Sequence, residues 1–481
     1  MNIVKKLVSA YLCQYPKRLT YLWQGSDYRS GAFIKWWWRV SDFRTVAHRG
    51  DVVATKASRV VHGVTLLSLG TYLLLSLLSI FLVRHSGVAF SLVVFVSIVL
   101  LPASVALFTM PVVWLLRAVY QTPKEQRLTK RAHDIFAKHP GVVIAVAGSY
   151  GKTTMKELLA AVLAREKKVA YTEGNRNVLT SIAQFATTLD GDEDIVIVEF
   201  GEGWRGDVER MTAVVQPDYA VLTGLASNHL DEYGSIEALS ADFMTLAHHV
   251  GPERLFFADD TRAMQEAFSS HGIGYGRHGV AERRVESINV EVNRLTFQLV
   301  GCGKKIDVVS GLVGEHNVGP LTLAVHIAHI FGGSTAHIEA ALRGTKPYEH
   351  RLEPRPLHGA WLIDDTYNGN IEGVRAGLAY LKALKADGRK IYVTPGLVDQ
   401  GNETKAVHLE MGRLIAECNP SDVYLMRNSV TDLIVEGLSA QPHTAAVRFV
   451  DDPLGFYNSL ETIVAKGDVV LCQNDWPDFY M

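Results

Sequence analysis

Two long apolar stretches dominate the first quarter of the chain. Residues 60–83 and 87–116 contain no Lys, Arg, Asp or Glu. Each stretch exceeds the ~20 residues that an α-helix needs to cross the hydrocarbon core of a bilayer. Only Arg84-His85-Ser86 lies between them, so the pattern predicts a two-helix transmembrane hairpin with a short turn. Pro102 and Pro111 are expected to kink the second helix or to end it early.

The alternative interpretation of these stretches is a pair of helices buried in a soluble core. A soluble helix usually keeps a polar face, which neither stretch shows. Basic residues outnumber acidic ones on both flanks, which predicts an inner-membrane protein whose N-terminus and downstream domains are cytoplasmic. These basic residues are Lys5, Lys6, Lys17, Arg18, Arg29, Lys35, Arg39, Arg44, Arg49, Lys56 and Arg59 before the hairpin, and Arg117, Lys124, Arg127, Lys130 and Arg131 after it.

The segment before the hairpin, residues 1–59, is rich in aromatic as well as basic side chains. Two interpretations fit this composition equally well. Basic residues with Trp and Tyr suit contact with anionic membrane lipid, whereas a small folded module would pack the rings against one another. The aromatic residues are Tyr11, Tyr15, Tyr21, Trp23, Tyr28, Phe33, Trp36, Trp37, Trp38 and Phe43.

After a polar linker at residues 117–139, short apolar runs alternate with helical patterns to the end of the chain. This alternation is typical of α/β domains with mostly parallel sheets and helices on both faces. We expect a P-loop-type central domain at 140–347, a hinge near 346–350 and a Rossmann-like C-terminal domain at 348–481. The predicted strands are 142–147, 169–172, 195–200, 219–223 and 255–258 in the first domain, and 360–363, 390–394, 422–426, 447–450 and 468–472 in the second.

The first strand of the central domain ends in Gly148-Ser149-Tyr150-Gly151-Lys152-Thr153-Thr154, which a helical pattern follows. A strand, a tight glycine turn and a helix N-terminus together form a site for phosphate. Glycine lets the backbone approach phosphate oxygens, Lys152 can neutralise β/γ-phosphate charge, and Thr153 can bind Mg²⁺. The alternative is a structural glycine turn with a surface lysine. The flanking strand and helix favour the phosphate interpretation.

Polar residues also stand at the ends of the next three predicted strands. Thr172-Glu173-Gly174-Asn175 follows the second, Glu199 ends the third, and Asn228-His229 follows the fourth. Ligands of such sheets bind at the carboxyl ends of the strands. A carboxylate inside an apolar strand needs a cation, and Mg²⁺ is a candidate. Taken alone, Glu199 would also fit an ion pair with arginine, and His229 a structural role.

Composition excludes several classes of protein. The formal net charge is −2, so binding to nucleic acid, which depends on neutralising phosphates, is not expected. The four cysteines are scattered and form no Cys-x-x-Cys pair, which argues against a disulfide framework or a zinc site.

Seven segments, in order, resemble motifs of the Mur ligase family, and most closely the branch that adds D-alanyl-D-alanine to a UDP-muramoyl tripeptide. The resemblance extends from about residue 142 to the C-terminus. The segments are 148–157 with the phosphate loop, 172–175, Glu199-Phe200-Gly201, 228–235 with His229, Gly314-Glu315-His316-Asn317, Arg351-Leu352-Glu353, and Asp364-Asp365-Thr366-Tyr367-Asn368-Gly369-Asn370.

The resemblance implies ATP and Mg²⁺ as cofactors, and it implies catalytic, metal-binding and nucleotide-binding roles for residues of these segments. Lys152, Arg351 and His229 are the implied catalytic residues. Mg²⁺ would be held by Thr153, Glu199 and His229. Nucleotide would contact Gly148, Ser149, Gly151, Lys152, Thr153, Thr154, Asn175, His316, Asn317, Asp365, Asn368 and Asn370.

Three departures from the family pattern bear on the substrate. Phe243 stands where the family has a lysine that supports a second Mg²⁺, with Asp242 beside it as a possible substitute, and Pro320 replaces an asparagine. The family's N-terminal module for the UDP-sugar is not recognisable; the basic segment and the hairpin stand in its place. A lipid-linked substrate is therefore an alternative to a UDP-linked one.

Three hypotheses follow for the function. The first is a membrane-anchored ATP-dependent amide ligase of peptidoglycan precursor synthesis, which joins an amino acid or dipeptide amine to a muramoyl peptide through an acyl phosphate. The second is a related ligase that acts on a lipid-linked or other cell-envelope acceptor. The third is a membrane-tethered ATP-binding switch that forms no bond. The intact phosphate loop favours the two ligases, whereas Phe243 favours the second and third hypotheses.

Overall fold

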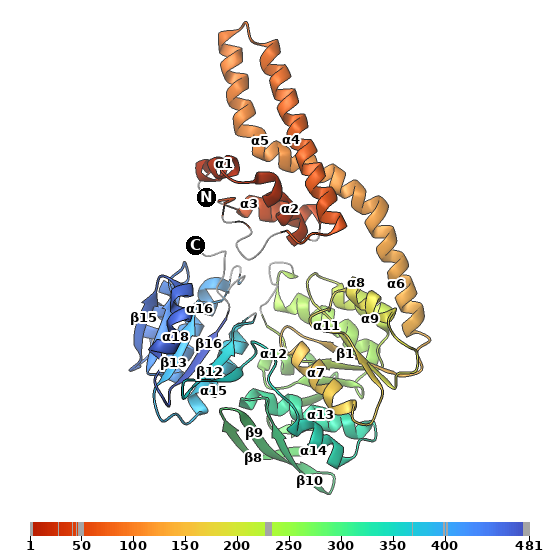
Figure 1. Cartoon of the computed structure of the whole chain (residues 1–481). Coiled ribbons are helices and arrows are strands. Elements are labelled where there is room, and N and C mark those ends of the chain that lie inside the picture. Colours follow the sequence, from red (N-terminus) through yellow and green to blue (C-terminus); the bar gives the residue numbers. More distant parts are fainter. Residues whose placement is uncertain are drawn as a thin grey trace. The chain divides into compact units, whose positions relative to one another are not determined.

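The computed structural model describes the chain except for residues 1–2, 27, 41, 45, 47–51, 227–232, 368, 398–399, 401–402 and 475–481. The chain divides into two compact units, Met1–Arg127 and Leu128–Met481 (Figure 1). The first unit is all helical. The second contains both sheets.

In its described residues the first unit consists of three short helices, a long antiparallel pair, the π-helical turn η1 (Arg117–Gln121) and the first residues of α6 (Thr122–Phe136) (Figure 1). The helices are α1 (Ile3–Tyr11), α2 (Tyr15–Gly25), α3 (Ser30–Arg39), α4 (Lys56–Leu82) and α5 (Gly87–Leu116). Helix α5 does not end at Pro102 or Pro111 but runs through both. Pro102 has no N–H for the carbonyl oxygen of Ile98 one turn earlier. The Tyr11 hydroxyl donates a hydrogen bond to this oxygen, which replaces the lost partner.

Most of the aromatic residues before the hairpin pack in the core of the first unit, whereas Tyr11 and Trp38 are exposed. The Trp23 and Phe33 rings stack with centroids 3.9 Å apart, and Phe43 packs edge-on against Tyr15 at 4.9 Å. The Trp23 indole N–H donates to Thr109 Oγ1 of α5 at 3.0 Å. Of the two interpretations of this segment, the structure therefore shows the folded module.

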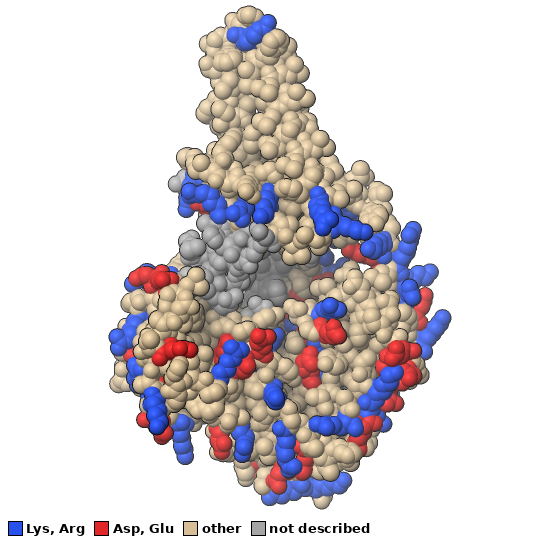
Figure 2. All heavy atoms as spheres, in the orientation of Figure 1, with Lys and Arg blue, Asp and Glu red and all other residues tan. Residues whose placement is uncertain are grey.

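Helices α4 and α5 are long and apolar enough to cross a membrane. Most of their large apolar side chains are exposed, among them Leu74, Leu77, Phe81, Leu92 and Phe95. On the face in Figure 2, the projecting part of the hairpin carries charged side chains only at its tip and its base. A soluble helix pair would bury these side chains, because their burial is the main source of stability in water.

The larger sheet of the second unit has ten strands in the order β10-β9-β8-β7-β6-β5-β4-β1-β3-β2. The five parallel strands β1 to β5 were predicted, β6, which pairs parallel with β5, was not, and β1 lies between β3 and β4. The antiparallel extension of the sheet, β7 to β10, was not predicted. The strands are β1 (Val142–Ala147), β2 (Val169–Tyr171), β3 (Ile195–Glu199), β4 (Tyr219–Leu222), β5 (Leu255–Ala258), β6 (Ile273–Gly276), β7 (Gly279–Val280), β8 (Arg283–Glu291), β9 (Arg294–Gly301) and β10 (Lys304–Ser310).

Helices cover both faces of this sheet (Figure 1). One apolar cluster joins the sheet to α7 (Lys152–Leu163), α13 (Val318–Ile330) and α14 (Thr335–Arg343). The other joins it to the end of α6 (Thr122–Phe136) and to the helices α8 (Leu179–Ala186), α9 (Asp207–Val215), α11 (Ile236–Val250) and α12 (Arg262–Phe268). Strand β1 is therefore buried on both sides, which explains its continuous apolar run.

The C-terminal sheet has six strands in the order β11-β12-β16-β13-β14-β15, of which only the edge strand β11 runs antiparallel to its neighbour. Apolar clusters pack its helices against it. Its elements are β11 (Glu353–Leu357), β12 (Ala360–Asp365), α15 (Ile371–Ala383), β13 (Lys390–Thr394), α16 (Thr404–Cys418), β14 (Asp422–Met426), α17 (Thr431–Ser439), β15 (Ala446–Val450), α18 (Pro453–Ile463) and β16 (Val469–Gln473).

Candidate active site

The phosphate loop, residues 148–153, connects the carboxyl end of β1 to the first turn of α7. Gly148 has φ 140°, and a Cβ there would lie 2.3 Å from Thr223 Oγ1, so a side chain is excluded. Gly151 precedes α7 with φ 74°, a left-handed conformation that glycine adopts without strain. The Ser149 N–H donates to the carbonyl oxygen of Gly224 at 2.9 Å. The loop is thus fixed against β4, with the N-terminus of α7 directed into it.

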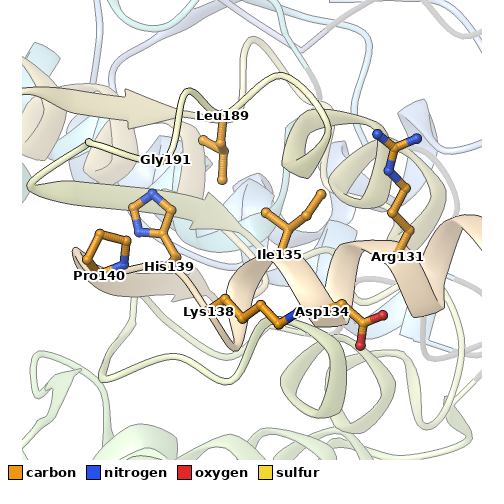
Figure 3. A pocket seen from close by; sticks show the side chains of 8 residues that line it. All are labelled: Arg131, Asp134, Ile135, Lys138, His139, Pro140, Leu189 and Gly191. Atoms are coloured by element: carbon orange, nitrogen blue, oxygen red, sulfur yellow. The ribbon is translucent and has the colours of Figure 1, made fainter.

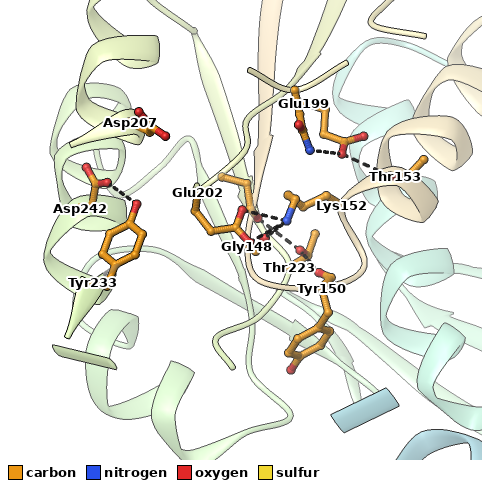
Figure 4. Close-up of polar contacts among 12 residues, drawn as sticks. Gly148, Tyr150, Lys152, Thr153, Glu199, Glu202, Asp207, Thr223, Tyr233 and Asp242 are labelled. Atoms are coloured by element: carbon orange, nitrogen blue, oxygen red, sulfur yellow. Dashed lines mark hydrogen bonds and ion pairs between the residues drawn. The ribbon is translucent and has the colours of Figure 1, made fainter. Parts of the chain in front are cut away.

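Lys152 is the first residue of α7, and its ammonium group pairs with the carboxylate of Glu202. Its Nζ lies 2.8 Å from Glu202 Oε2 and 2.9 Å from Oε1, and it also donates to the carbonyl oxygen of Gly148 (Figure 4). Glu202 is only 3% exposed. Sequence reasoning did not single out Glu202. Its only signal is a second acidic residue shortly after Glu199, at the end of a buried strand.

Glu199, at the end of β3, is 1% exposed and faces the first turn of α7. Its Oε1 accepts hydrogen bonds from Thr153 Oγ1 at 3.2 Å and Asn177 Nδ2 at 3.1 Å. Its Oε2 lies 3.2 Å from Lys156 Nζ but accepts no hydrogen bond from the described residues. The structure thus brings Thr153 and Glu199 together, as predicted from the sequence, and the cation beside Oε2 in this structure is the Lys156 ammonium.

Lys156 is a fully buried lysine in this cluster that sequence reasoning missed. Besides its ion pair with Glu199, its Nζ donates to the carbonyl oxygen of Gly174 at 2.6 Å and lies 3.4 Å from Glu157 Oε1. The available signal was its position three residues after Thr153, because residues three apart share a face of a helix. Lys156 fixes the orientation of Glu199 and ties the loop after β2 to α7.

The loop after β2 also reaches the C-terminal domain. Asn175 Nδ2 donates to the Tyr367 hydroxyl at 3.2 Å. The Arg351 guanidinium lies over the ring of Tyr367, with its central carbon 4.5 Å from the ring centroid. Contacts therefore connect Glu199 through Lys156 and this loop to Arg351, although these residues are far apart in the sequence.

Asp365 lies at the end of β12 in the C-terminal domain. Burial raises the pKa of its carboxyl to about 7, although hydrogen bonds from Gln473 Nε2 and the Leu352 N–H act in the opposite direction. Asn370 is 7% exposed, and its side chain accepts from the Gly373 N–H at the start of α15. The Asn370 side-chain oxygen thus caps the start of α15, and the nucleotide contacts predicted for Asp365 and Asn370 stay predictions.

The other predicted site residues lie on α7, directly before the neighbouring helix α13, or outside the described residues. His316 and Asn317 are in a short 3-10 helix, η2 (Glu315–Asn317), directly before α13, which packs against α7. Thr154 lies in the first turn of α7 and is half-buried. His229 and Asn368 are outside the described residues, so their roles stay predictions.

Asp242 and Phe243 stand where the family pattern has its lysine. The Asp242 carboxylate accepts from the N–H groups of Gly206 at 3.0 Å and Glu209 at 3.1 Å, and from the Tyr233 hydroxyl at 2.8 Å (Figure 4). Phe243 is 1% exposed and belongs to the apolar core. Asp242 thus caps the N-terminus of α9 and is occupied by this role, so it is not a substitute for the family's lysine.

A cavity of about 330 Å³ lies away from the phosphate loop, next to the residues that precede β1 (Figure 3). It is lined by Arg131, Asp134, Ile135, Lys138, His139, Pro140, Leu189 and Gly191. Nearby, Lys168 pairs with Asp190 and Asp192, and Glu193 pairs with His139 at 2.9 Å. Each of these carboxylates thus has a side-chain partner, and the phosphate loop is at the opposite end of β1. We therefore place the candidate active site at the loop.

Comparison with known proteins agrees with this geometry. Residues 146–328 match the family model of the Mur ligase middle domain. This part of the chain is a Mur ligase middle domain. The match covers the phosphate loop and Glu199, and it ends within α13.

Relatives and solved structures extend the similarity beyond the Mur ligase middle domain. The UDP-N-acetylmuramoyl-tripeptide–D-alanyl-D-alanine ligase of Bacillus subtilis is 23% identical over 331 residues, which cover 68% of this chain and 72% of that protein. The enzyme of the same name from Escherichia coli is 26% identical over 281 residues, which cover 57% and 62%. Crystal structures of MurF from Acinetobacter baumannii, and from Thermotoga maritima in complex with ADP, share the fold. Each has a TM-score of 0.64 at 23% identity, covering 73% of this chain and 77% or 80% of the other.

Proposed function

We propose that this chain is an ATP-dependent ligase of the Mur type, which joins an amine to the carboxylate of a muramoyl peptide. D-Alanyl-D-alanine is the proposed amine, as in the names of the B. subtilis and E. coli relatives. The observation that carries the proposal is the phosphate loop, with Lys152 and Thr153 facing buried carboxylates inside a Mur ligase middle domain. The T. maritima neighbour, solved with ADP, supports ATP as the nucleotide.

The proposed chemistry has two steps. The acceptor carboxylate attacks the γ-phosphorus of ATP, so that an acyl phosphate forms and ADP leaves. The amine nitrogen then attacks the acyl carbon, a proton is lost, and phosphate leaves as the amide forms. Lys152 and the N–H groups of the phosphate loop stabilise negative charge on the transferring phosphoryl group. Arg351 supplies a second positive charge.

The residues at the phosphate loop fit Mg²⁺, which prefers oxygen ligands. Glu199 Oε2 accepts no hydrogen bond from the described residues, and the Thr153 hydroxyl lies beside the same carboxylate. Thr153 and Glu199 would hold the ion, together with His229 as the family resemblance implies. Bound Mg²⁺ would neutralise charge on the phosphate oxygens. Lys156 would keep Glu199 oriented toward the loop.

The contacts between the two sheet domains help to exclude water, which would hydrolyse an acyl phosphate. Asn175 reaches Tyr367, and the Tyr380 hydroxyl donates to the carbonyl oxygen of Val292 at 2.6 Å. Val290, Val292 and Val313 of the central domain also pack against the apolar cluster of the C-terminal domain.

We propose further that α4 and α5 anchor the enzyme in the inner membrane, with both sheet domains in the cytoplasm. This part rests on the exposed apolar surface of the two helices and on the basic flanks. The same helices favour a second candidate function, ligation on a lipid-linked muramoyl peptide. An enzyme held at the bilayer can meet an acceptor that is confined to the bilayer.

The test is release of phosphate by the full chain in lipid nanodiscs with ATP and Mg²⁺. UDP-linked and lipid-linked muramoyl tripeptides are supplied in turn, each with and without D-alanyl-D-alanine. We expect phosphate release that requires both the acceptor and the amine, and a product whose mass equals acceptor plus dipeptide minus water. ATP hydrolysis independent of both substrates, without product, would overturn the ligase proposal in favour of an ATP-binding switch.

A further inference from the structure

Helix α1 exposes three large aliphatic side chains, whereas its buried side contains a lysine and a serine together with Ala10. Ile3, Val4 and Val8 are 63%, 69% and 50% exposed, whereas Lys6 and Ser9 are buried. Leu12, just after the helix, continues the apolar surface at 64% exposed. In water this arrangement exposes the side chains that should be buried.

The buried side of α1 is fixed by specific contacts, so its orientation is not accidental. Lys6 Nζ donates to the carbonyl oxygens of Trp37 at 2.5 Å and Trp38 at 3.1 Å, in the last turn of α3. It also lies 4.0 Å from the centroid of the Trp37 ring. On the same side, Ser9 Oγ accepts from the Phe43 N–H at 2.9 Å. Cations stabilise the C-terminal end of a helix, which favours Lys6 at the end of α3. Because Lys6 and Ser9 are held on the inner side of α1, its large aliphatic side chains face outward.

The position of α1 along the hairpin indicates what covers this face. The Tyr11 hydroxyl contacts the carbonyl oxygen of Ile98, and the Tyr15 hydroxyl donates to that of Pro102 at 2.7 Å. The stretch of α5 from Gly87 to Ile98 is only ~17 Å long, at ~1.5 Å per residue. The hydrocarbon core is ~30 Å thick. If the hairpin spans it, α1 lies at the depth of the acyl chains or their boundary with the headgroups.

We propose that α1 is an in-plane membrane helix, whose Ile3, Val4, Val8 and Leu12 lie against the acyl chains of the cytoplasmic leaflet. The inference rests on the proposed insertion of α4 and α5, whose exposed apolar surface the α1 face continues. Lys5, exposed on α1 and 3.7 Å from Asp42, lies at the polar edge of this face. Amphipathic helices of this kind bury their apolar side ~5–10 Å below the headgroups.

The test measures the depth of spin labels in the full chain, reconstituted in nanodiscs of phosphatidylethanolamine and phosphatidylglycerol. Cys13, Cys302, Cys418 and Cys472 are first replaced by serine. Single labels are then attached through Val4→Cys, Val8→Cys, Leu77→Cys on α4, and Lys385→Cys. Leu77 and Lys385 are exposed and serve as the hairpin reference and the aqueous reference. Relaxation by oxygen, which concentrates in lipid, is compared with relaxation by a water-soluble nickel chelate.

We expect the labels at Val4 and Val8 to respond more to oxygen than to nickel, as at Leu77, and the label at Lys385 to respond in the opposite way. Nickel-accessible labels at Val4 and Val8, with Leu77 in lipid, would overturn the in-plane helix but leave the anchor intact. Nickel access at Leu77 as well would overturn both. Labels shielded from both reagents, with spin–spin broadening that dilution with unlabelled chain removes, would show that a second copy covers the face and would also overturn the inference.

Discussion

The central domain and the first unit depart from the usual distribution of polar and apolar residues in opposite directions. The central domain buries Lys156, Glu199 and Glu202, each no more than 3% exposed. The first unit exposes Val4 and Leu77 at 65% or more. Burial of charge is costly unless the charge is paired, and exposure of large apolar surface is costly in water. The first departure supports the proposed site for a charged ligand, and the second supports the proposed membrane anchor.

The largest effect is expected from removing the positive charge of Lys152 in the phosphate loop. We expect Lys152→Ala to lower ATP turnover by about a thousandfold, since loss of one group that stabilises transition-state charge costs ~10²–10³ in rate. Turnover is measured as ADP release at saturating Mg²⁺. Lys385→Ala, which changes an exposed lysine, is the matched control. Turnover at the control level would remove Lys152 from the site.

Substitution of Lys156 tests whether the buried ion pair with Glu199 stands in for a metal. We expect Lys156→Met to destabilise the metal-free protein by about 3–5 kcal/mol, because it leaves a buried carboxylate without a cation. Mg²⁺ should restore much of this loss, because it supplies a replacement charge. Thermal unfolding with Mg²⁺ and with chelator measures both effects, and Lys385→Met is the control. An equal loss in both conditions would argue against metal at Glu199.

A charge placed on the hairpin tests whether the exposed apolar surface of the first unit lies in lipid. We expect Leu74→Arg, at an exposed position nearer the middle of the span, to weaken membrane insertion by about 2.5–3.5 kcal/mol, the cost of arginine near the centre of a spanning helix. The readout is the fraction of protein that stays with membranes after an alkaline carbonate wash. Leu454→Arg changes a leucine on α18 that is 77% exposed and should have no effect. Equal retention of both variants would contradict a lipid environment for α4.

The smallest expected effect concerns Asp365, whose buried carboxyl has its pKa raised from 3.8 to about 7. Between these values the folded state holds a proton that the unfolded chain releases, so the stability contributed by this group falls as pH rises from about 4 to 7. We expect Asp365→Asn to remove this slope, which changes the difference in Tm between about pH 5 and pH 8 by roughly 2–4 °C. Asp451→Asn, at an exposed carboxylate, should keep the slope.

The sequence predicted the parallel strands β1 to β5 closely but missed the parallel strand β6 and the antiparallel extension. Strand β1 and its parallel neighbours are continuous apolar runs because both of their faces are covered. Strand β8, in contrast, has mostly exposed side chains, and Arg283-Arg284 and Glu286 interrupt its apolar pattern. A strand with one solvated face is expected to alternate apolar and polar residues. Strand β8 lacks this alternation, whereas β9 shows it in Leu295, Phe297 and Leu299, which are buried, so β9 could have been predicted and β8 could not.

The candidate site was predictable where polar residues follow apolar strands, and less so inside helices. Lys152, Thr153 and Glu199 stand at strand or helix ends, where their position alone indicated a role. Lys156 lies within the helical Met155-Lys156-Glu157, where a lysine normally points to solvent. The packing of α7 against the sheet decides which of its faces is buried, and this packing depends on contacts between residues distant in sequence.

The short loop after β2 has a consequence for how the enzyme would respond to its ligands. The carbonyl oxygen of Gly174 contacts Lys156 beside the phosphate loop, and the neighbouring Asn175 contacts Tyr367 of the C-terminal domain. The adjacent residues Gly174 and Asn175 thus contact the residues beside the phosphate loop and the C-terminal domain, respectively. If a ligand at Glu199 shifted this loop, occupancy there and the position of the C-terminal domain would be linked equilibria, each changing the other by the same free energy. Loading of the nucleotide would in this way prepare the second domain before any amine arrives.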